Sequence, residues 1–189
     1  MLPDRVGLLR RSPRYGEAML RPDDDTGELA LGVVLVVGGG KVACSLARAL
    51  TLAGLDVALG SRHPVPLPRA SQPWRVVAWE DVSRTAADLV VVAVSDDAIP
   101  GVASRLDPRI PAVHCSGASS PDALSPIATR GVWHPLMAFP TRTTPVAPST
   151  VFGVCAGEPL ACRLVALTRQ LGCRAVSLDA GDLPIYHSA

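Results

Sequence analysis

Apolar and polar positions alternate in blocks along most of the chain, with glycine or proline between the blocks. Residues 31–37 read Leu-Gly-Val-Val-Leu-Val-Val, and a β-branched run of this kind is typical of a central strand buried on both faces. Three glycines follow at 38–40, and apolar residues then recur at helical spacing over 42–52. A second short apolar run occupies 56–60. The pattern predicts one strand–helix–strand unit with a glycine turn at its centre.

The same alternation of strand and helix signals continues toward the end of the chain. A proline-rich stretch at 140–148 interrupts it and predicts an extended connection. This alternation is typical of a doubly wound, mostly parallel α/β sheet with helices on its faces. The further strands are predicted at 75–79, 87–94, 111–114, 131–133, 151–156 and 174–178, and the further helices at 96–106 and 159–171.

Composition limits the classes of partner. The 189-residue chain carries a net charge of +1, and 4% of its residues are aromatic, which disfavours a nucleic-acid binder with a basic patch and a stacking platform. The longest apolar run, residues 31–37, is too short to span a membrane, and we expect no signal peptide because no apolar segment follows the N-terminal arginines before the acidic residues at 23–25. Five cysteines without a CxxC pair indicate a reducing compartment. We therefore expect a cytoplasmic protein with no nucleic-acid or membrane partner.

The glycine turn has the spacing of a dinucleotide-binding loop. Gly38-x-Gly40-x-x-Ala43 fits the G-x-G-x-x-A pattern. In this pattern the first glycine allows a tight turn, the second lets backbone N–H groups approach a diphosphate, and the small third residue lets the helix pack on the strand. The N-terminus of the following helix favours an anion, and the alternative is a glycine-rich turn that binds nothing. We assign the diphosphate site to Gly38, Gly39, Gly40, Lys41, Val42 and Ala43.

The residues after the second strand bear on the choice of coenzyme. An NAD site usually has Asp or Glu there to hold the ribose hydroxyls, whereas this chain has Ser61 and Arg62. A guanidinium beside a hydroxyl suits a 2′-phosphate, so the sequence favours NADP over NAD, although Arg62 as a solvated loop residue is the alternative. Val94 ends the predicted fourth strand and Ser95 follows it, and both are expected beside the nicotinamide ribose. The two aspartates at 96–97 are interpreted as helix caps.

Two further polar groups at strand ends are candidates for catalysis. Ser116 could hydrogen-bond a substrate oxygen, and His134 could act as acid or base beside a hydride transfer. Each has a structural alternative, because Ser116 could belong to a simple turn and His134 could cap a loop. Two weaker hypotheses remain. A Cys115 nucleophile with a histidine base has no visible activating group, and a metal site built from His114, Cys115 and His134 does not have the spacing of a standard ligand set.

Six motifs occur in an order that resembles a known family. The chain is similar, from about residue 31 to its end, to the predicted oxidoreductases that join a Rossmann-like domain to a C-terminal domain of unknown function. These proteins are relatives of the 6-phosphogluconate dehydrogenase and pyrroline-5-carboxylate reductase group. The motifs are Val-Val-Gly-Gly-Gly-Lys-Val-Ala at 36–43, Gly60-Ser-Arg62, Ala93-Val-Ser-Asp-Asp-Ala-Ile99, His114-Cys-Ser-Gly-Ala118, His134-Pro-Leu-Met-Ala-Phe139 and Tyr186-His-Ser-Ala189.

The resemblance implies a domain organisation. It predicts an NADP-binding domain followed by an all-helical domain that dimerises and closes the active site. In such proteins Tyr-His-x-Ala begins the first helix of that second domain, and here the motif at 186–189 ends the chain. We therefore expect a poorly ordered leader at 1–30, a Rossmann-like dinucleotide-binding domain at 31–150, and a final strand–helix–strand unit at 151–189 that leads into a missing helical domain. A homodimer is expected where the helical domain is present.

The resemblance also implies a reaction class. We expect an NADP-dependent oxidoreductase that transfers hydride to or from a small substrate such as an imine, a keto acid or a hydroxy acid. The segment His134-Pro-Leu is similar to the His-Pro-Met segment of prephenate dehydrogenases, whose histidine contacts the substrate, and this supports His134. The alternative is an NAD(P)-binding module without catalysis, or an inactive truncated remnant, because the chain stops where the helical domain would begin.

Overall fold

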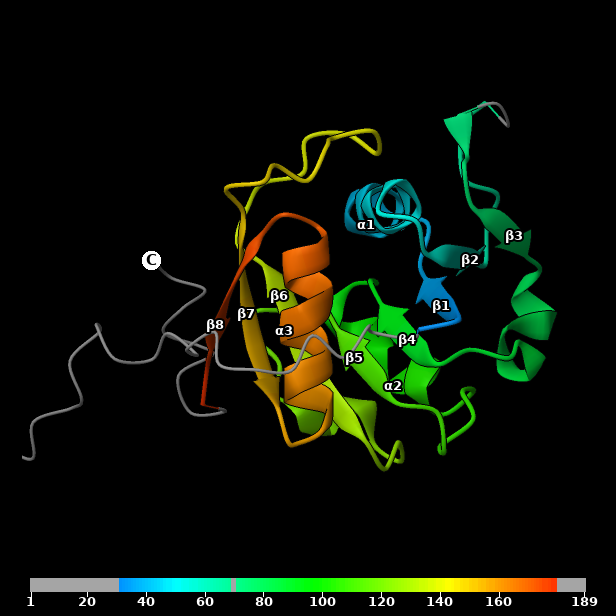
Figure 1. Ribbon diagram of the computed structural model, residues 1–189. Helices are drawn as coiled ribbons and strands as arrows, with labels where there is room; N and C mark the ends of the chain where they lie inside the picture. Colours follow the sequence, from blue (N-terminus) through cyan, green and yellow to red (C-terminus); the bar gives the residue numbers. More distant parts are fainter. Residues whose placement is uncertain (1–30, 69–70, 180–189) are drawn as a thin grey trace, which may run out of the picture.

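In the part of the chain that the structure describes, eight strands form a single sheet in the order β3-β2-β1-β4-β5-β6-β7-β8 (Figure 1). A computed structural model describes residues 31–68 and 71–179. The strands are β1 (Val33–Val37), β2 (Asp56–Gly60), β3 (Arg75–Val77), β4 (Leu89–Val92), β5 (Ala112–His114), β6 (Arg130–Pro135), β7 (Val151–Ala156) and β8 (Arg174–Ser177). The α-helices are α1 (Lys41–Leu52), α2 (Ile99–Ala103) and α3 (Leu160–Gln170), and the 3₁₀ helices are η2 (Trp79–Arg84), η3 (Asp96–Ala98) and η4 (Pro121–Leu124).

The strand order reverses direction at β1. From β1 the chain moves outward through β2 to β3, and it then returns to the other side of β1 to add β4, β5 and β6, all paired in parallel. The predicted doubly wound, mostly parallel sheet is therefore confirmed. In such a sheet the crevice outside the carboxyl ends of the two strands at the reversal, here β1 and β4, is where ligands bind.

The last two strands run against the rest. β7 pairs antiparallel with β6, with Trp133 opposite Val154, and β8 then pairs parallel with β7. Because β6 and β7 are antiparallel neighbours, the connection at 136–150 can return along the sheet edge without a crossover helix. This connection starts at the carboxyl end of β6, which is the same edge that carries the glycine turn.

Helices cover both faces of the sheet. One core cluster packs α1 and α3 against one face, and it includes Trp133 and Phe152, whose rings stack with their centroids 4.6 Å apart. The second cluster packs α2, η2 and η4 against the other face. Burial on both faces explains why the strands at the centre read as continuous apolar runs: in β1, Val34 and Val36 belong to the first cluster and Leu35 and Val37 to the second.

Pairing partners account for where the strand boundaries differ from the sequence prediction. The third strand, predicted at 75–79, ends at Val77, because that residue pairs with Gly60, where β2 itself ends. Trp79 instead begins η2. The sixth strand, predicted at 131–133, extends to Pro135 because β7 pairs along its second edge up to that residue.

Two expectations concern segments outside the described residues. These are the leader at 1–30 and the motif at 186–189. The unit at 151–179, which contains β7, α3 and β8, belongs to the same sheet as the strands before it. Across the part of the chain that the structure describes, no helix combines the length and the apolar character needed to cross a membrane.

Candidate functional site

The turn after β1 has room only for glycine at its first position. Gly38 has a φ of +141°, and its N–H donates to the carbonyl oxygen of Gly60 at 2.8 Å. A Cβ at Gly38 would overlap the carbonyl oxygen of Ala93, and it would lie 3.2 Å from the Cβ of Ala43. The turn is therefore pressed between the end of β4 and the first turn of α1, as the sequence pattern predicts for a first glycine and a small third residue.

The last glycine of the turn faces open space. Gly40 is the N-cap of α1, with φ −79° and ψ −176°, and a Cβ built there meets no atom within 4 Å. Its carbonyl oxygen accepts the first helical hydrogen bond, from the N–H of Cys44 at 3.1 Å. The N–H groups of the first turn of α1 have no helical acceptor, the N-cap residue Gly40 has no side chain to cap them, and no acidic residue lies in this turn. The helix therefore presents uncapped amide donors of positive partial charge.

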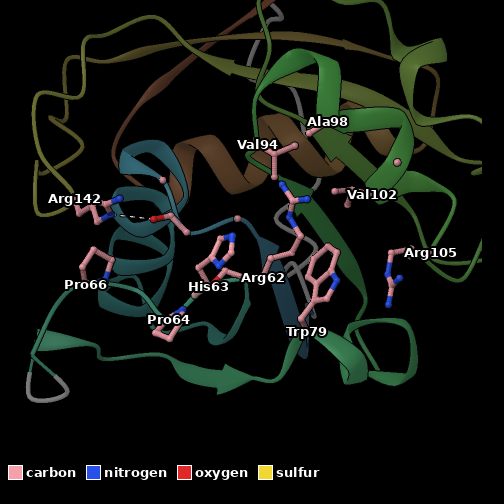
Figure 2. A pocket seen from close by; sticks show the side chains of 15 residues that line it. Arg62, His63, Pro64, Pro66, Trp79, Val94, Ala98, Val102, Arg105 and Arg142 are labelled. Atoms are coloured by element: carbon pink, nitrogen blue, oxygen red, sulfur yellow. Dashed lines mark hydrogen bonds between the residues drawn. The ribbon is translucent and has the colours of Figure 1, made fainter.

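A cavity of about 580 Å³ opens at this turn (Figure 2). It lies at the carboxyl ends of β1, β2 and β4, which is the position that the strand order predicts for a ligand crevice. Its volume falls within the range of about 300–1,000 Å³ that is usual for small-molecule and cofactor sites. The residues that line it are Gly38, Gly39, Gly40, Ser61, Arg62, His63, Pro64, Pro66, Trp79, Val94, Ala98, Gly101, Val102, Arg105 and Arg142.

The side chains around the cavity carry positive charge. Arg62 follows β2, Arg105 follows α2, and Arg142 lies in the connection between β6 and β7. The guanidinium carbon of Arg105 lies 5.1 Å from the ring centroid of Trp79, within cation–π range. Of the described residues that line the cavity, none is aspartate or glutamate. The lining therefore combines positive charge, which suits an anionic ligand, with the flat ring of Trp79.

Arg142 contacts the glycine turn directly. Its Nε–H donates to the carbonyl oxygen of Gly39 at 2.9 Å, a contact between residues 103 positions apart in the sequence (Figure 2). The connection that carries it, residues 136–150, reaches over toward α1 in Figure 1. Neither Arg142 nor Arg105 was assigned to the site from the sequence, because no local motif links either residue to the turn.

The structure brings together six of the ten residues assigned to the coenzyme from the sequence. Those that line the cavity are Gly38, Gly39, Gly40, Ser61, Arg62 and Val94, and those that do not are Lys41, Val42, Ala43 and Ser95. The side chain of Ala43 is buried against the turn, while Lys41 is exposed. For these first-turn residues of α1, the backbone amides rather than the side chains are available to a ligand.

The hydroxyl and guanidinium after β2 lie at the cavity wall. Ser61 packs beside the turn, since a Cβ at Gly39 would lie 3.2 Å from the Cβ of Ser61. Its Oγ donates to the carbonyl oxygen of His63, which orders the loop after β2. Arg62 is exposed at the mouth of the cavity. The two residues are thus positioned by the end of β2 beside the glycine turn.

The helix-cap assignment of Asp96 and Asp97 is wrong. The N-cap of η3 is Ser95, and neither carboxylate makes a capping hydrogen bond. Asp96 and Asp97 instead occupy the first turn of η3, where they are exposed and where their charge interacts favourably with the helix N-terminus.

Ser116 and His134 lie at the ends of β5 and β6, outside the lining of the cavity. The Oγ of Ser116 accepts hydrogen bonds from the N–H groups of Ala118 and Ser119, both at 3.1 Å. His134 approaches the carbonyl oxygen of Cys115 through Nδ1 at 2.7 Å, and because a carbonyl only accepts, Nδ1 must carry the proton. The ring packs on Gly117, where a Cβ would lie 2.8 Å from Nε2. A catalytic role for Ser116 and His134 stays a prediction.

The remaining chemistry considered from the sequence does not fit this neighbourhood. Burial raises the pKa of the Cys115 thiol to about 12, so the thiolate needed for a nucleophile is scarce near neutral pH. His114 is fully buried, and its Nε2 lies 3.0 Å from the carbonyl oxygen of Ser120. Within residues 31–68 and 71–179, no group of three or more His, Cys, Asp or Glu side chains is placed to hold a metal ion.

The fold is shared with solved dehydrogenases and reductases. The chain superposes on a protein from Bacteroides fragilis provisionally assigned as an NADP oxidoreductase, with a TM-score of 0.69, 21% identity, and coverage of 83% of this chain and 64% of that one. It also superposes on Synechocystis arogenate dehydrogenase, with a TM-score of 0.67, 18% identity, and coverage of 80% and 61%. Prephenate dehydrogenase from A. aeolicus, solved with hydroxyphenyl propionate and NAD+, gives a TM-score of 0.66, 13% identity, and coverage of 82% and 63%.

These likenesses establish a Rossmann-like fold. The chain matches no protein-family model and no curated protein sequence. It spans about three fifths of the length of each of the three solved chains, with coverages of 64%, 61% and 63%.

Proposed function

We propose that this chain binds an NAD(P) dinucleotide at the glycine turn, with NADP preferred, and that it belongs to an oxidoreductase acting on a small imine, keto acid or hydroxy acid. The observation that carries the proposal is the cavity at the carboxyl ends of β1 and β4, where the strand order reverses. There, uncapped amides of α1, a glycine with open space in front of it, and three arginines face one volume. The solved structures of the same fold support it, since their names include an NADP oxidoreductase and a complex with NAD+.

The diphosphate of the coenzyme fits the turn. Gly40 leaves the space in front of the α1 N-terminus empty, so phosphate oxygens could approach the backbone without meeting a side chain. The first-turn amides would donate to those oxygens, and the helix dipole would favour their negative charge. The guanidinium of Arg142 stands at the same wall and adds a full positive charge.

The adenosine half fits the side of the cavity formed after β2. Ser61 and Arg62 would hold a 2′-phosphate through a hydroxyl and a guanidinium. The cavity lining among the described residues has no carboxylate to accept from a free ribose diol, which favours NADP over NAD. Trp79 and Arg105 would offer flat surfaces to the adenine ring.

The chemistry would come from the coenzyme. A bound nicotinamide supplies or accepts hydride, while the protein supplies binding and orientation. Ser116 would donate a hydrogen bond to a substrate oxygen, and His134, with its proton held on Nδ1 by the Cys115 carbonyl, would hold or receive a proton at Nε2. Ser116 follows β5 and His134 lies on β6. These are the first and second strands beyond β4, on the side of β1 away from Arg62.

A second candidate is a nucleotide-binding module without catalysis. Ser116 and His134 do not line the cavity, so neither candidate catalytic side chain lies at the proposed binding site. The two candidates share the coenzyme site and differ in turnover. A His134→Asn variant separates them, because it should bind NADPH like the wild type while losing most of any reductase activity toward imines or keto acids.

Calorimetric titration with NADPH and NADH tests the binding proposal. The wild type should bind NADPH more tightly than NADH. Arg62→Ala should weaken NADPH about fivefold or more, as expected for loss of an exposed charge pair worth about 1 kcal/mol, and it should leave NADH nearly unchanged. Arg84→Ala, an exposed arginine of η2 outside the cavity, is the matched control. Absence of binding for both nucleotides would refute the proposed function, and equal weakening of both would refute the role of Arg62.

A further inference from the structure

We propose that Arg142 is a positioning residue that fixes the Gly39–Gly40 peptide for the coenzyme diphosphate and offers its remaining guanidinium donors to it from the β6–β7 connection. The inference rests on the proposed coenzyme site, and it adds a residue that no motif of the sequence assigns. Its basis is the hydrogen bond from Arg142 Nε to the Gly39 carbonyl oxygen at 2.9 Å, made by a side chain that also lines the cavity.

The hydrogen bond sets the direction of a backbone donor. The Gly39–Gly40 bond is trans, so the carbonyl of Gly39 and the N–H of Gly40 point in opposite directions from one peptide plane. With the carbonyl held toward Arg142, the Gly40 N–H must point away from the guanidinium. Two adjacent glycines have more backbone freedom than any other pair, so ordering this plane on binding would be costly without hydrogen bonds to hold it. The Cys44 thiol also approaches the Gly39 carbonyl oxygen, at 3.9 Å, and Arg142 is the shorter contact of the two.

Arg142 has further donors than the one that the turn uses. A guanidinium carries five N–H groups in a fixed fork, and only the Nε–H is taken by Gly39. Arg142 lines the cavity, and its terminal nitrogens have the planar geometry that binds phosphate oxygens in pairs. The charge also reaches the helix behind the turn, since it counteracts part of the rise that burial causes in the pKa of the Cys44 thiol.

The segment around Arg142 is ordered by its own hydrogen bonds. The N–H of Thr141 donates to the Oγ1 of Thr144 at 3.0 Å, and that hydroxyl donates back to the carbonyl oxygen of Thr141 at 3.0 Å. Because these hydrogen bonds already order the turn that contains Arg142, little of its conformational entropy would be lost when a ligand binds. The β6–β7 connection therefore acts as a fixed arm that reaches the glycine turn rather than as a loose loop.

Replacement of Arg142 should separate diphosphate affinity from adenosine affinity. The probes are NADPH and adenosine 2′-monophosphate, which has the 2′-phosphate but no diphosphate. Arg142→Met should weaken NADPH at least tenfold and adenosine 2′-monophosphate less than twofold. Arg142→Lys, which keeps the charge without the fork, should lie between the wild type and Arg142→Met for NADPH. Arg163→Met, a half-buried arginine on α3 away from the cavity, is the control and should change neither affinity.

A readout on the free protein isolates the positioning role. In Arg142→Met the Gly40 amide should exchange faster and shift in the nitrogen–proton NMR spectrum, while the melting temperature stays near that of the wild type. The proposal would be overturned if Arg142→Met and Arg142→Lys both bound NADPH with an affinity within twofold of the wild type. It would also be overturned if Arg142→Met lost affinity for both probes equally and had a lowered melting temperature. If the wild type binds neither probe, the coenzyme site itself is refuted, and an unchanged Gly40 amide in Arg142→Met separately refutes the positioning role.

Discussion

A single methyl group at Gly40 should weaken coenzyme binding strongly without disturbing the fold. Gly40 has φ −79° and ψ −176°, a conformation that alanine adopts readily, and its Cβ would meet nothing within 4 Å. The gain from a less flexible unfolded chain, about 0.4–1 kcal/mol, and the weaker N-cap, a loss of similar size, should nearly cancel. We expect Gly40→Ala to change the free energy of unfolding by less than about 1 kcal/mol.

The effect on binding should be much larger. The methyl group would occupy the space through which phosphate oxygens reach the first-turn amides of α1. A hydrogen bond from a backbone N–H to a charged oxygen contributes about 1.5–3 kcal/mol. Loss of one such bond raises the Kd about 10- to 150-fold, since each 1.4 kcal/mol is about tenfold.

The assay is calorimetric titration with NADPH alongside urea denaturation of the same preparation. Gly157→Ala is the matched control, because its Cβ also meets nothing within 4 Å and it lies outside the cavity at the glycine turn. The control should bind NADPH like the wild type. If Gly40→Ala binds NADPH within threefold of the wild type, the diphosphate does not rest on this turn, and the physical basis of the assignment is lost.

Three further predictions concern the core and the titratable groups. Thr168→Val removes the acceptor of the buried Trp133 indole N–H, now 2.8 Å from Thr168 Oγ1, and should lower the free energy of unfolding by about 1–3 kcal/mol in urea denaturation. Burial lowers the pKa of His114 below its usual value of 6.5, so the unfolded chain takes up this proton first as pH falls; stability should therefore decline below pH 6.5, and His114→Gln should flatten that decline. A disulfide reagent at pH 8 should label exposed Cys162 first, and in Cys162→Ser the Cys115 thiol, whose pKa is about 12, should react only after denaturation.

The sheet could be predicted because its signals are local. The β-branched run that forms β1 packs into both core clusters, as a central parallel strand does, and the glycine turn followed by a helical repeat identifies the unit it belongs to. Strand ends were less predictable, since β3 stops where its partner β2 stops, at Gly60. The end of β3 therefore depends on its pairing with β2, which the residues of β3 alone do not reveal.

The candidate site was predictable on one side only. Gly38, Ser61 and Arg62 follow strands directly, so their place at the carboxyl edge comes from the strand assignment alone. Arg142 reaches the same cavity from 103 residues beyond Gly39, through a connection whose path depends on the antiparallel pairing of β6 with β7. No periodicity or motif near residue 142 reports that contact, which explains why sequence reasoning missed it.

The position of Ser116 and His134 outside the cavity is compatible with a catalytic role for them. The cavity occupies the ends of β1, β2 and β4, and His134 stands on β6, three strands from β1. Neighbouring strands are about 4.8 Å apart, so His134 lies roughly 14 Å across the sheet edge from the turn. A dinucleotide with its adenosine beside Arg62 and its diphosphate on the turn would extend its nicotinamide past Val94 toward β5 and β6. Groups that act on the substrate would then lie beyond the binding cavity. The position of Ser116 and His134 outside its wall is therefore compatible with an enzyme and with a binding module, and a measurement of turnover is needed to separate the two.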